Sequence, residues 1–210
     1  KHTPLKYQED IDCSASTDFL HFASYGIGNC QLYESPWSDG FYKQIEGYSN
    51  VAAFVFSNST VLSKQQLFFP VAFLLRNAIE LSLKRLLNAR NEICVPKQIQ
   101  ISKRNSHLLY KDLWCNVKPI IEHYASDHGE DLSQIIVADA YLKRLDELDK
   151  NGDAFRYPVN YGLQYRFDKQ VFDLENVHHW MQGIFNFLDG CDSMLSVIYD
   201  YECEMRSYYY

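Results

Sequence analysis

Apolar residues recur at helical spacing along most of this chain, beginning near residue 39. Residues three and four apart lie on the same face of a helix, so each run of this kind predicts a helix with one buried face. The pattern predicts five long helices, at about 40–62, 64–90, 106–126, 130–149 and 173–205. Because no convincing strand accompanies them, we expect an all-α protein, an antiparallel bundle of four to five long helices.

The segments outside these helices carry turn chemistry. Glycine, proline, asparagine and serine cluster within residues 1–38, which we interpret as an irregular N-terminal arm ahead of a helical domain at 39–210. Between the fourth and fifth helices, Gly152, Pro158 and Gly162 interrupt the helical rhythm. A small hairpin is predicted in this interval, at about residues 164–171.

Composition narrows the class of protein. The apolar content of 47% excludes global disorder. A net charge of -7 gives no general attraction to nucleic acid, so any RNA contact has to be confined to a small site. No run approaches 18 consecutive apolar residues, and the N-terminus lacks the apolar segment of a secretory signal. We therefore expect no membrane span and a cytoplasmic location.

The metal-binding residue types are poorly placed for a metal. The six cysteines contain no C-x-x-C pair, so reduced thiols are expected. His123 and His128, five residues apart, point away from each other on a helix, and the pair His178-His179 has no cysteine or carboxylate to complete a set. Phosphate-binding glycine motifs are also missing from the sequence. We expect no metal and no cofactor.

One predicted helix carries charge among apolar residues. Arg76, Glu80 and Lys84 are four residues apart, so they form a narrow stripe, and Phe, Leu and Ile flank it on both sides. Charges in such surroundings must be paired and hydrogen-bonded. The stripe is therefore either a set of structural ion pairs or the floor of a polar site, and the sequence leaves both interpretations open.

Two further residues are candidates for chemistry. His107 stands at the start of a predicted helix and could serve as an acid or base, although a capping or core histidine is the commoner role. Arg156 lies between two aromatic residues just before Pro158, so its planar fork is held and suits a carboxylate or phosphate. The nearby Asp146, Asp149 and Asp153 could ligate Mg²⁺, but salt bridges and caps are the commoner roles for such residues.

Three segments that contain these residues resemble the HEPN superfamily (higher eukaryotes and prokaryotes nucleotide-binding), in particular a bacterial branch associated with anti-phage defence. The segments are Phe73–Lys84, Ser106–Trp114 and Asp149–Pro158, and they occur in the expected order. The resemblance implies a four- or five-helix up-and-down bundle, often dimeric, with polar residues converging at the dimer face. It also implies a metal-independent ribonuclease that uses an R-x4-6-H motif, which this sequence lacks.

Two functions follow as expectations. In the first, Arg76, Glu80, His107 and Arg156 form one catalytic cleft that acts on RNA or a nucleotide, in a bacterial anti-phage defence or toxin–antitoxin system. In the second, the same residues hold the helices in register, and the chain is a catalytically inert HEPN-like subunit. That subunit would act as a homodimer or by binding a partner enzyme.

Overall fold

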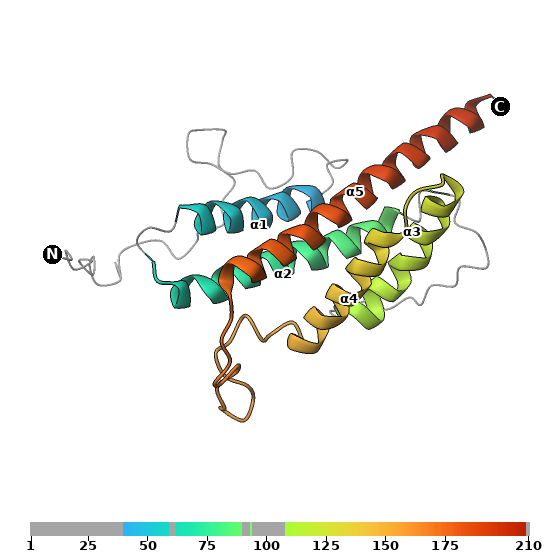
Figure 1. The fold of residues 1–210 in the computed structure, drawn as a ribbon. Helices are drawn as coiled ribbons and strands as arrows, with labels where there is room; N and C mark the ends of the chain where they lie inside the picture. Colours follow the sequence, from blue (N-terminus) through green and yellow to red (C-terminus); the bar gives the residue numbers. More distant parts are fainter. Residues whose placement is uncertain (1–39, 59–61, 90–92, 94–107, 209–210) are drawn as a thin grey trace, which may run out of the picture. The chain divides into compact units, whose positions relative to one another are not determined.

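A computed structural model describes residues 40–58, 62–89, 93 and 108–208 of the chain. The chain divides into two compact units, Lys1–Ser38 and Asp39–Tyr210, and the first, with the predicted arm, lies outside the described residues. The described part is all helical and contains no strand (Figure 1). Its elements are α1 (Gly40–Ser57), α2 (Lys64–Ala89), the π-helix η1 (Leu109–Trp114), α3 (Cys115–Asp127), α4 (Ser133–Leu148) and α5 (Leu174–Ser207).

The helix boundaries follow local capping chemistry. At the start of α2, the backbone N–H of Gln66 donates to Ser63 Oγ at 3.3 Å, and the Gln66 side chain accepts from the Ser63 N–H at 2.9 Å, a reciprocal capping box. At the start of α5, the Asp173 carboxylate accepts from two backbone N–H groups. The predicted first helix is too long, since α1 ends at Ser57.

The predicted hairpin at 164–171 is reduced to a single antiparallel bridge between Val159 and Tyr165. The paired segment lies earlier in the chain than predicted: the Arg166 N–H donates to the Pro158 carbonyl at 2.8 Å, and the Asn160 N–H donates to the Gln164 carbonyl at 2.9 Å. The Arg166 side chain adds a hydrogen bond to the Val159 carbonyl at 3.2 Å and an ion pair with Asp153 at 2.6 Å. Three non-glycine residues nearby adopt left-handed φ angles, namely Leu163, Phe167 and Lys169. Such angles interrupt the alternation that paired strands require, so the loop turns where the sequence predicted extension.

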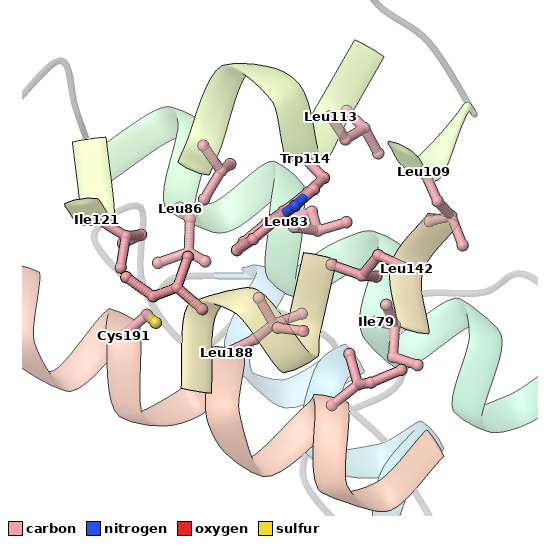
Figure 2. Close-up of a cluster of buried hydrophobic side chains, with 14 of the residues drawn as sticks. Ile79, Leu83, Leu86, Leu109, Leu113, Trp114, Ile121, Leu142, Leu188 and Cys191 are labelled. Carbon is pink, nitrogen blue, oxygen red and sulfur yellow. The ribbon is translucent and has the colours of Figure 1, made fainter. Parts of the chain in front are cut away.

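The core forms around α2, which has its most extensive contacts with α1 and α5. In Figure 2, Ile79, Leu83 and Leu86 of α2 lie among side chains of η1, α3, α4 and α5. The labelled side chains from these elements are Leu109, Leu113, Trp114, Ile121, Leu142, Leu188 and Cys191. Most of them are almost fully buried, so the helical spacing read from the sequence corresponds to real core faces.

The central position of α2 explains its composition. By length and hydropathy alone, the segment Lys64–Ala89 could cross a membrane, with a mean hydropathy of 1.2 over the best window. However, 56% of that window is buried inside the molecule by the other helices. A helix that is apolar on nearly all sides is expected where it is surrounded by protein. α2 is therefore accounted for as a core helix.

Candidate functional site

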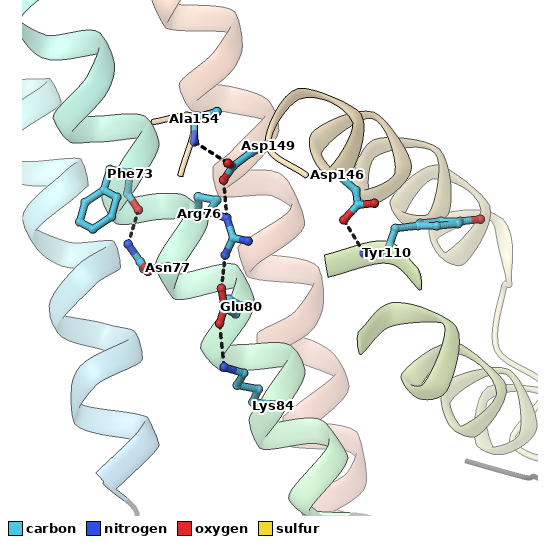
Figure 3. Close-up of polar contacts among 9 residues, drawn as sticks. All are labelled: Phe73, Arg76, Asn77, Glu80, Lys84, Tyr110, Asp146, Asp149 and Ala154. Atoms are coloured by element: carbon cyan, nitrogen blue, oxygen red, sulfur yellow. Dashed lines mark hydrogen bonds and ion pairs between the residues drawn. The ribbon is translucent and has the colours of Figure 1, made fainter. Parts of the chain in front are cut away.

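The charged stripe of α2 forms a continuous chain of ion pairs with a residue that follows α4 (Figure 3). Arg76 Nε donates to Asp149 Oδ2 at 2.6 Å, and Arg76 Nη1 bonds Glu80 Oε2. Lys84 Nζ then donates to the other oxygen of Glu80 at 2.7 Å. These four residues are called the Arg76 cluster. Two positive and two negative charges alternate along it, so its formal charge is balanced.

Three of the four residues of the Arg76 cluster are enclosed by protein, and Lys84 at its end is partly exposed. Arg76 is 2% exposed, Asp149 1% and Glu80 8%. Asp149 uses its second oxygen to accept from the Ala154 N–H at 2.7 Å, which anchors the chain after α4. The same segment approaches the guanidinium at Gly152, where φ is +71° and an added Cβ would lie 3.2 Å from Arg76 Nη2. The loop thus closes over the arginine at a position that only glycine occupies without strain.

The other predicted site residues are placed differently. Arg156 is exposed, and its Cζ lies 5.4 Å from the centre of the Phe73 ring, a cation–π contact one turn before Arg76. His107 lies outside the described residues. The structure therefore brings Arg76 and Glu80 together in the interior and leaves Arg156 at the surface of the same region.

The three aspartates considered as Mg²⁺ ligands have protein partners. Asp149 belongs to the Arg76 cluster, and Asp153 pairs with Arg166 at 2.6 Å. Asp146 accepts from the Tyr110 N–H at 3.3 Å, where η1 begins. A side chain from α4 thus serves one of the unpaired N–H groups that open a helix. In the described part of the chain, no three His, Cys, Asp or Glu side chains gather as a metal site would require.

Asp139 on α4 is the centre of a polar cluster that the sequence analysis missed. Its carboxylate accepts from Trp114 Nε1 at 2.9 Å, Lys118 Nζ at 2.9 Å and the Tyr110 hydroxyl at 3.2 Å. Burial alone would raise the pKa of Asp139, but the hydrogen bonds from Lys118 and Trp114 outweigh it and hold the pKa below its ordinary value. The three donors are four residues apart, a signal that could have revealed a shared acceptor.

A groove of about 690 Å³ lies among the end of α1 and the first turns of α2 and α5, and we call it the α1–α5 groove. Phe56 and His178 stack in parallel in its wall, with ring centres 3.9 Å apart. Within the part of the chain that the structure describes, the buried atoms His178 Nε2 and Gln182 Oε1 have no hydrogen-bond partner. Burial and the neighbouring His179 lower the pKa of His178, which favours the neutral imidazole.

Comparison of this chain with protein-family models, with curated proteins and with solved structures finds no match. The described residues of the three segments Phe73–Lys84, Ser106–Trp114 and Asp149–Pro158 lie close together in the fold. The first and third segments share the Arg76–Asp149 ion pair across 73 residues of sequence. The second segment reaches Asp146, three residues before Asp149, through Tyr110.

Proposed function

We propose that this protein is a HEPN-like helical bundle that serves as a cytoplasmic component of a bacterial anti-phage defence or toxin–antitoxin system. The observation that carries the proposal is the Arg76–Asp149 ion pair at 2.6 Å. It joins Phe73–Lys84 to Asp149–Pro158, two of the three segments that resemble this family. Tyr110 brings the remaining segment, Ser106–Trp114, to the same end of α4. Segments that match a family in order and also meet in space support the resemblance more strongly than the motifs alone.

Within this proposal, the geometry favours a subunit that acts by assembly rather than by catalysis. Both charged partners of Arg76 are buried with it, and the guanidinium is only 2% exposed. A phosphate would have to displace these carboxylates, and unpaired buried charges destabilise a protein strongly. The Arg76 cluster then serves to hold α2 against the chain that follows α4. The protein would act as a homodimer or as the partner of an enzyme.

A second candidate function is action on RNA or a nucleotide, as a metal-independent ribonuclease or a nucleotide-modifying enzyme. The observation that favours it is Arg156, whose exposed guanidinium is held over Phe73 in the same region. A planar guanidinium fixed at the surface suits a phosphate. His107, which precedes the first described residue of η1 by two positions, would transfer the proton.

Two substitutions distinguish these functions, with melting temperature, RNA cleavage and phage infection of expressing cells as readouts. If the protein acts by assembly, Arg156→Ala leaves all three unchanged, while Arg76→Ala lowers the melting temperature sharply. If it cleaves RNA, Arg156→Ala abolishes cleavage at an unchanged melting temperature. Arg144→Ala is the matched control, because its side chain is also an exposed arginine, 68% accessible on α4. The defence role itself is contradicted if expression changes neither phage infection nor cell growth.

A further inference from the structure

α5 carries two apolar stripes side by side. The buried stripe faces the core and repeats at alternating steps of three and four residues: Met181, Ile184, Leu188, Cys191, Leu195 and Ile198. One position earlier, a second set follows the same steps, and we call it the α5 seam: Trp180, Gly183, Phe187, Gly190, Met194, Val197 and Tyr201. This spacing is that of a helix–helix seam. Val197 is 69% exposed and Tyr201 62%, so the far end of the seam faces solvent.

The C-terminal part of α5 is accessible to solvent along most of its length. After Ile198, none of the described residues up to Tyr208 is buried, and Glu202 and Cys203 are half-buried. Figure 1 shows this end of the helix extending past the ends of α1 and α2. Helices in water owe most of their stability to packing of an apolar face. The exposed Tyr201 and Tyr208 give this part of α5 an aromatic surface available for such packing.

The N-terminal part of the seam borders an apolar groove between α4 and α5, here called the α4–α5 groove. Its volume is about 230 Å³, and Val137 and Tyr141 of α4 face Trp180, Gly183 and Phe187 of α5 across it. An added Cβ at Gly183 would meet nothing within 4 Å, and the same holds at Gly190. The floor of this groove is therefore open to a large side chain from outside.

We propose that two copies of this protein form a two-fold dimer in which their α5 seams pack antiparallel, the projecting half of each helix lying in the α4–α5 groove of the other. The dimer rests on the proposed function, because it names the surface through which such a subunit assembles. In the register centred near residue 192, Tyr201 of one copy lies over Gly183 of the other. The other seam layers pair Met194 with Gly190 and Val197 with Phe187.

Steric fit identifies a second copy as the occupant. Val197 and Tyr201 are exposed near the C-terminal end of the seam, whereas Gly183 and Gly190 leave open space in its N-terminal half, beside an apolar groove. A two-fold axis places Tyr201 of each copy in the space at Gly183 of the other, and such self-complementary surfaces are typical of symmetric dimers. Small residues also let two helix backbones approach closely.

Charge decides the direction of the two helices. Continuing the seam by one step reaches Glu204. In a parallel pair, Glu204 would face Glu204, which is repulsive, and the large side chains of Trp180 and Tyr201 would each face their own counterpart. In the antiparallel pair, Glu204 lies beside Trp180 and close to the exposed His179 of the other copy, and the two helix dipoles oppose each other favourably.

The test is the molar mass of the full chain in solution, measured by sedimentation equilibrium over a range of concentrations. We expect a dimer, and we expect Val197→Arg to weaken dimerisation about 30-fold or more, as loss of a central interface residue does. Val197 is 69% exposed, so the substitution leaves the monomer fold intact, which circular dichroism checks. Phe54→Arg is the matched control, since Phe54 is an equally exposed apolar residue (67%) on α1.

Disulfide cross-linking tests the direction and register of the two α5 helices. In the variant Gly183→Cys/Tyr201→Cys, oxidation should give intermolecular 183–201 disulfides, identified by peptide mapping of mixed isotope-labelled copies. A 183–183 product would overturn the antiparallel register. A wild-type chain that remains monomeric at all concentrations, or a dimer that Val197→Arg leaves intact, overturns the seam. The phage-infection assay is independent of these measurements. A failure of the dimer can therefore be distinguished from a failure of the proposed function.

Discussion

The Arg76 cluster and the α1–α5 groove both place polar atoms among apolar side chains, but only the cluster supplies each of them with a partner. In the cluster, Arg76 bonds two carboxylates, and Asp149 also receives a backbone N–H. In the groove, His178 Nε2 and Gln182 Oε1 are buried without a partner among the described residues. The first arrangement is costly to break, and the second lowers stability as it stands. The same fold thus contains one polar cluster that stabilises it and one groove whose unpaired polar atoms lower its stability.

Breaking the cluster gives the largest expected effect. Arg76→Met leaves the carboxylates of Glu80 and Asp149 buried without their counter-charge, so we expect the free energy of unfolding to fall by about 3–5 kcal/mol. Urea denaturation followed by circular dichroism measures this. The variant Arg76→Met/Glu80→Gln/Asp149→Asn removes the stranded charges and should recover most of the loss. Equal stability of the single and triple variants would show that the ion pairs do not hold this region together.

The hydrogen bonds around Asp139 are partly exposed, so breaking them should lower the free energy of unfolding by less. The side chain of Asp139 is 25% exposed, and its three donors join α4 to η1 and α3. We expect Asp139→Ala to lower the free energy of unfolding by about 1–2 kcal/mol, the lower part of the range for lost charged hydrogen bonds. Because the pKa of Asp139 is lowered in the fold, its contribution is present above pH 3.8 and is lost as the pH falls through the folded pKa. Asp139→Asn should therefore flatten the acid end of the stability profile.

In the α1–α5 groove, removing a polar atom should raise the free energy of unfolding. His178→Phe removes an unpartnered buried nitrogen and keeps a flat ring against Phe56, so we expect a gain of about 1 kcal/mol in the free energy of unfolding. Gln182→Leu is the contrasting variant, because it also removes the hydrogen bond from Gln182 Nε2 to Asn186 at 3.0 Å and should bring no such gain. A loss of stability in His178→Phe would mean that the imidazole nitrogen is satisfied in solution.

The same histidine gives a pH dependence of known sign. Its pKa in the fold lies below the ordinary 6.5, so below that pH the unfolded chain binds more protons than the folded one. Stability should be complete above pH 6.5 and should fall as the pH drops toward the folded pKa. Melting temperatures between pH 5 and 8 measure this, and His178→Phe should remove this part of the slope. A slope that persists unchanged in the variant would assign it to another group.

The smallest expected effect concerns the glycines of the α5 seam. In the monomeric Val197→Arg background, Gly190→Ala should raise the free energy of unfolding by about 0.5–1 kcal/mol, since an added Cβ meets nothing within 4 Å and alanine favours a helix. Thermal melts of the two monomeric proteins measure the difference. A destabilising effect would mean that a neighbouring group already fills the space above Gly190.

The sequence predicted the helices well because their signal is local. Apolar residues at steps of three and four predicted the bounds of α2 and α5 almost to the residue. The four-residue spacing of Arg76, Glu80 and Lys84 likewise predicted a continuous charged stripe. Asp139 was missed because it lies on another helix: the four-residue spacing of Tyr110, Trp114 and Lys118 points to a shared acceptor but not to the residue that supplies it. The hairpin was predicted too far along the chain: backbone pairing spans residues 158–166, and left-handed φ angles at Phe167 and Lys169 turn the chain where extension was predicted.

By itself, the amino-acid sequence determined that this protein is helical, where its core faces lie, and that Arg76 needs a counter-charge inside an apolar helix. Only the tertiary structure decided that Asp149 supplies that counter-charge from 73 residues away, and that Arg156 remains at the surface. The physical reason is that helical spacing repeats within one segment and can be read there. Pairing between segments depends on the path of the loops that join them, and that path is set by contacts formed only in the folded chain.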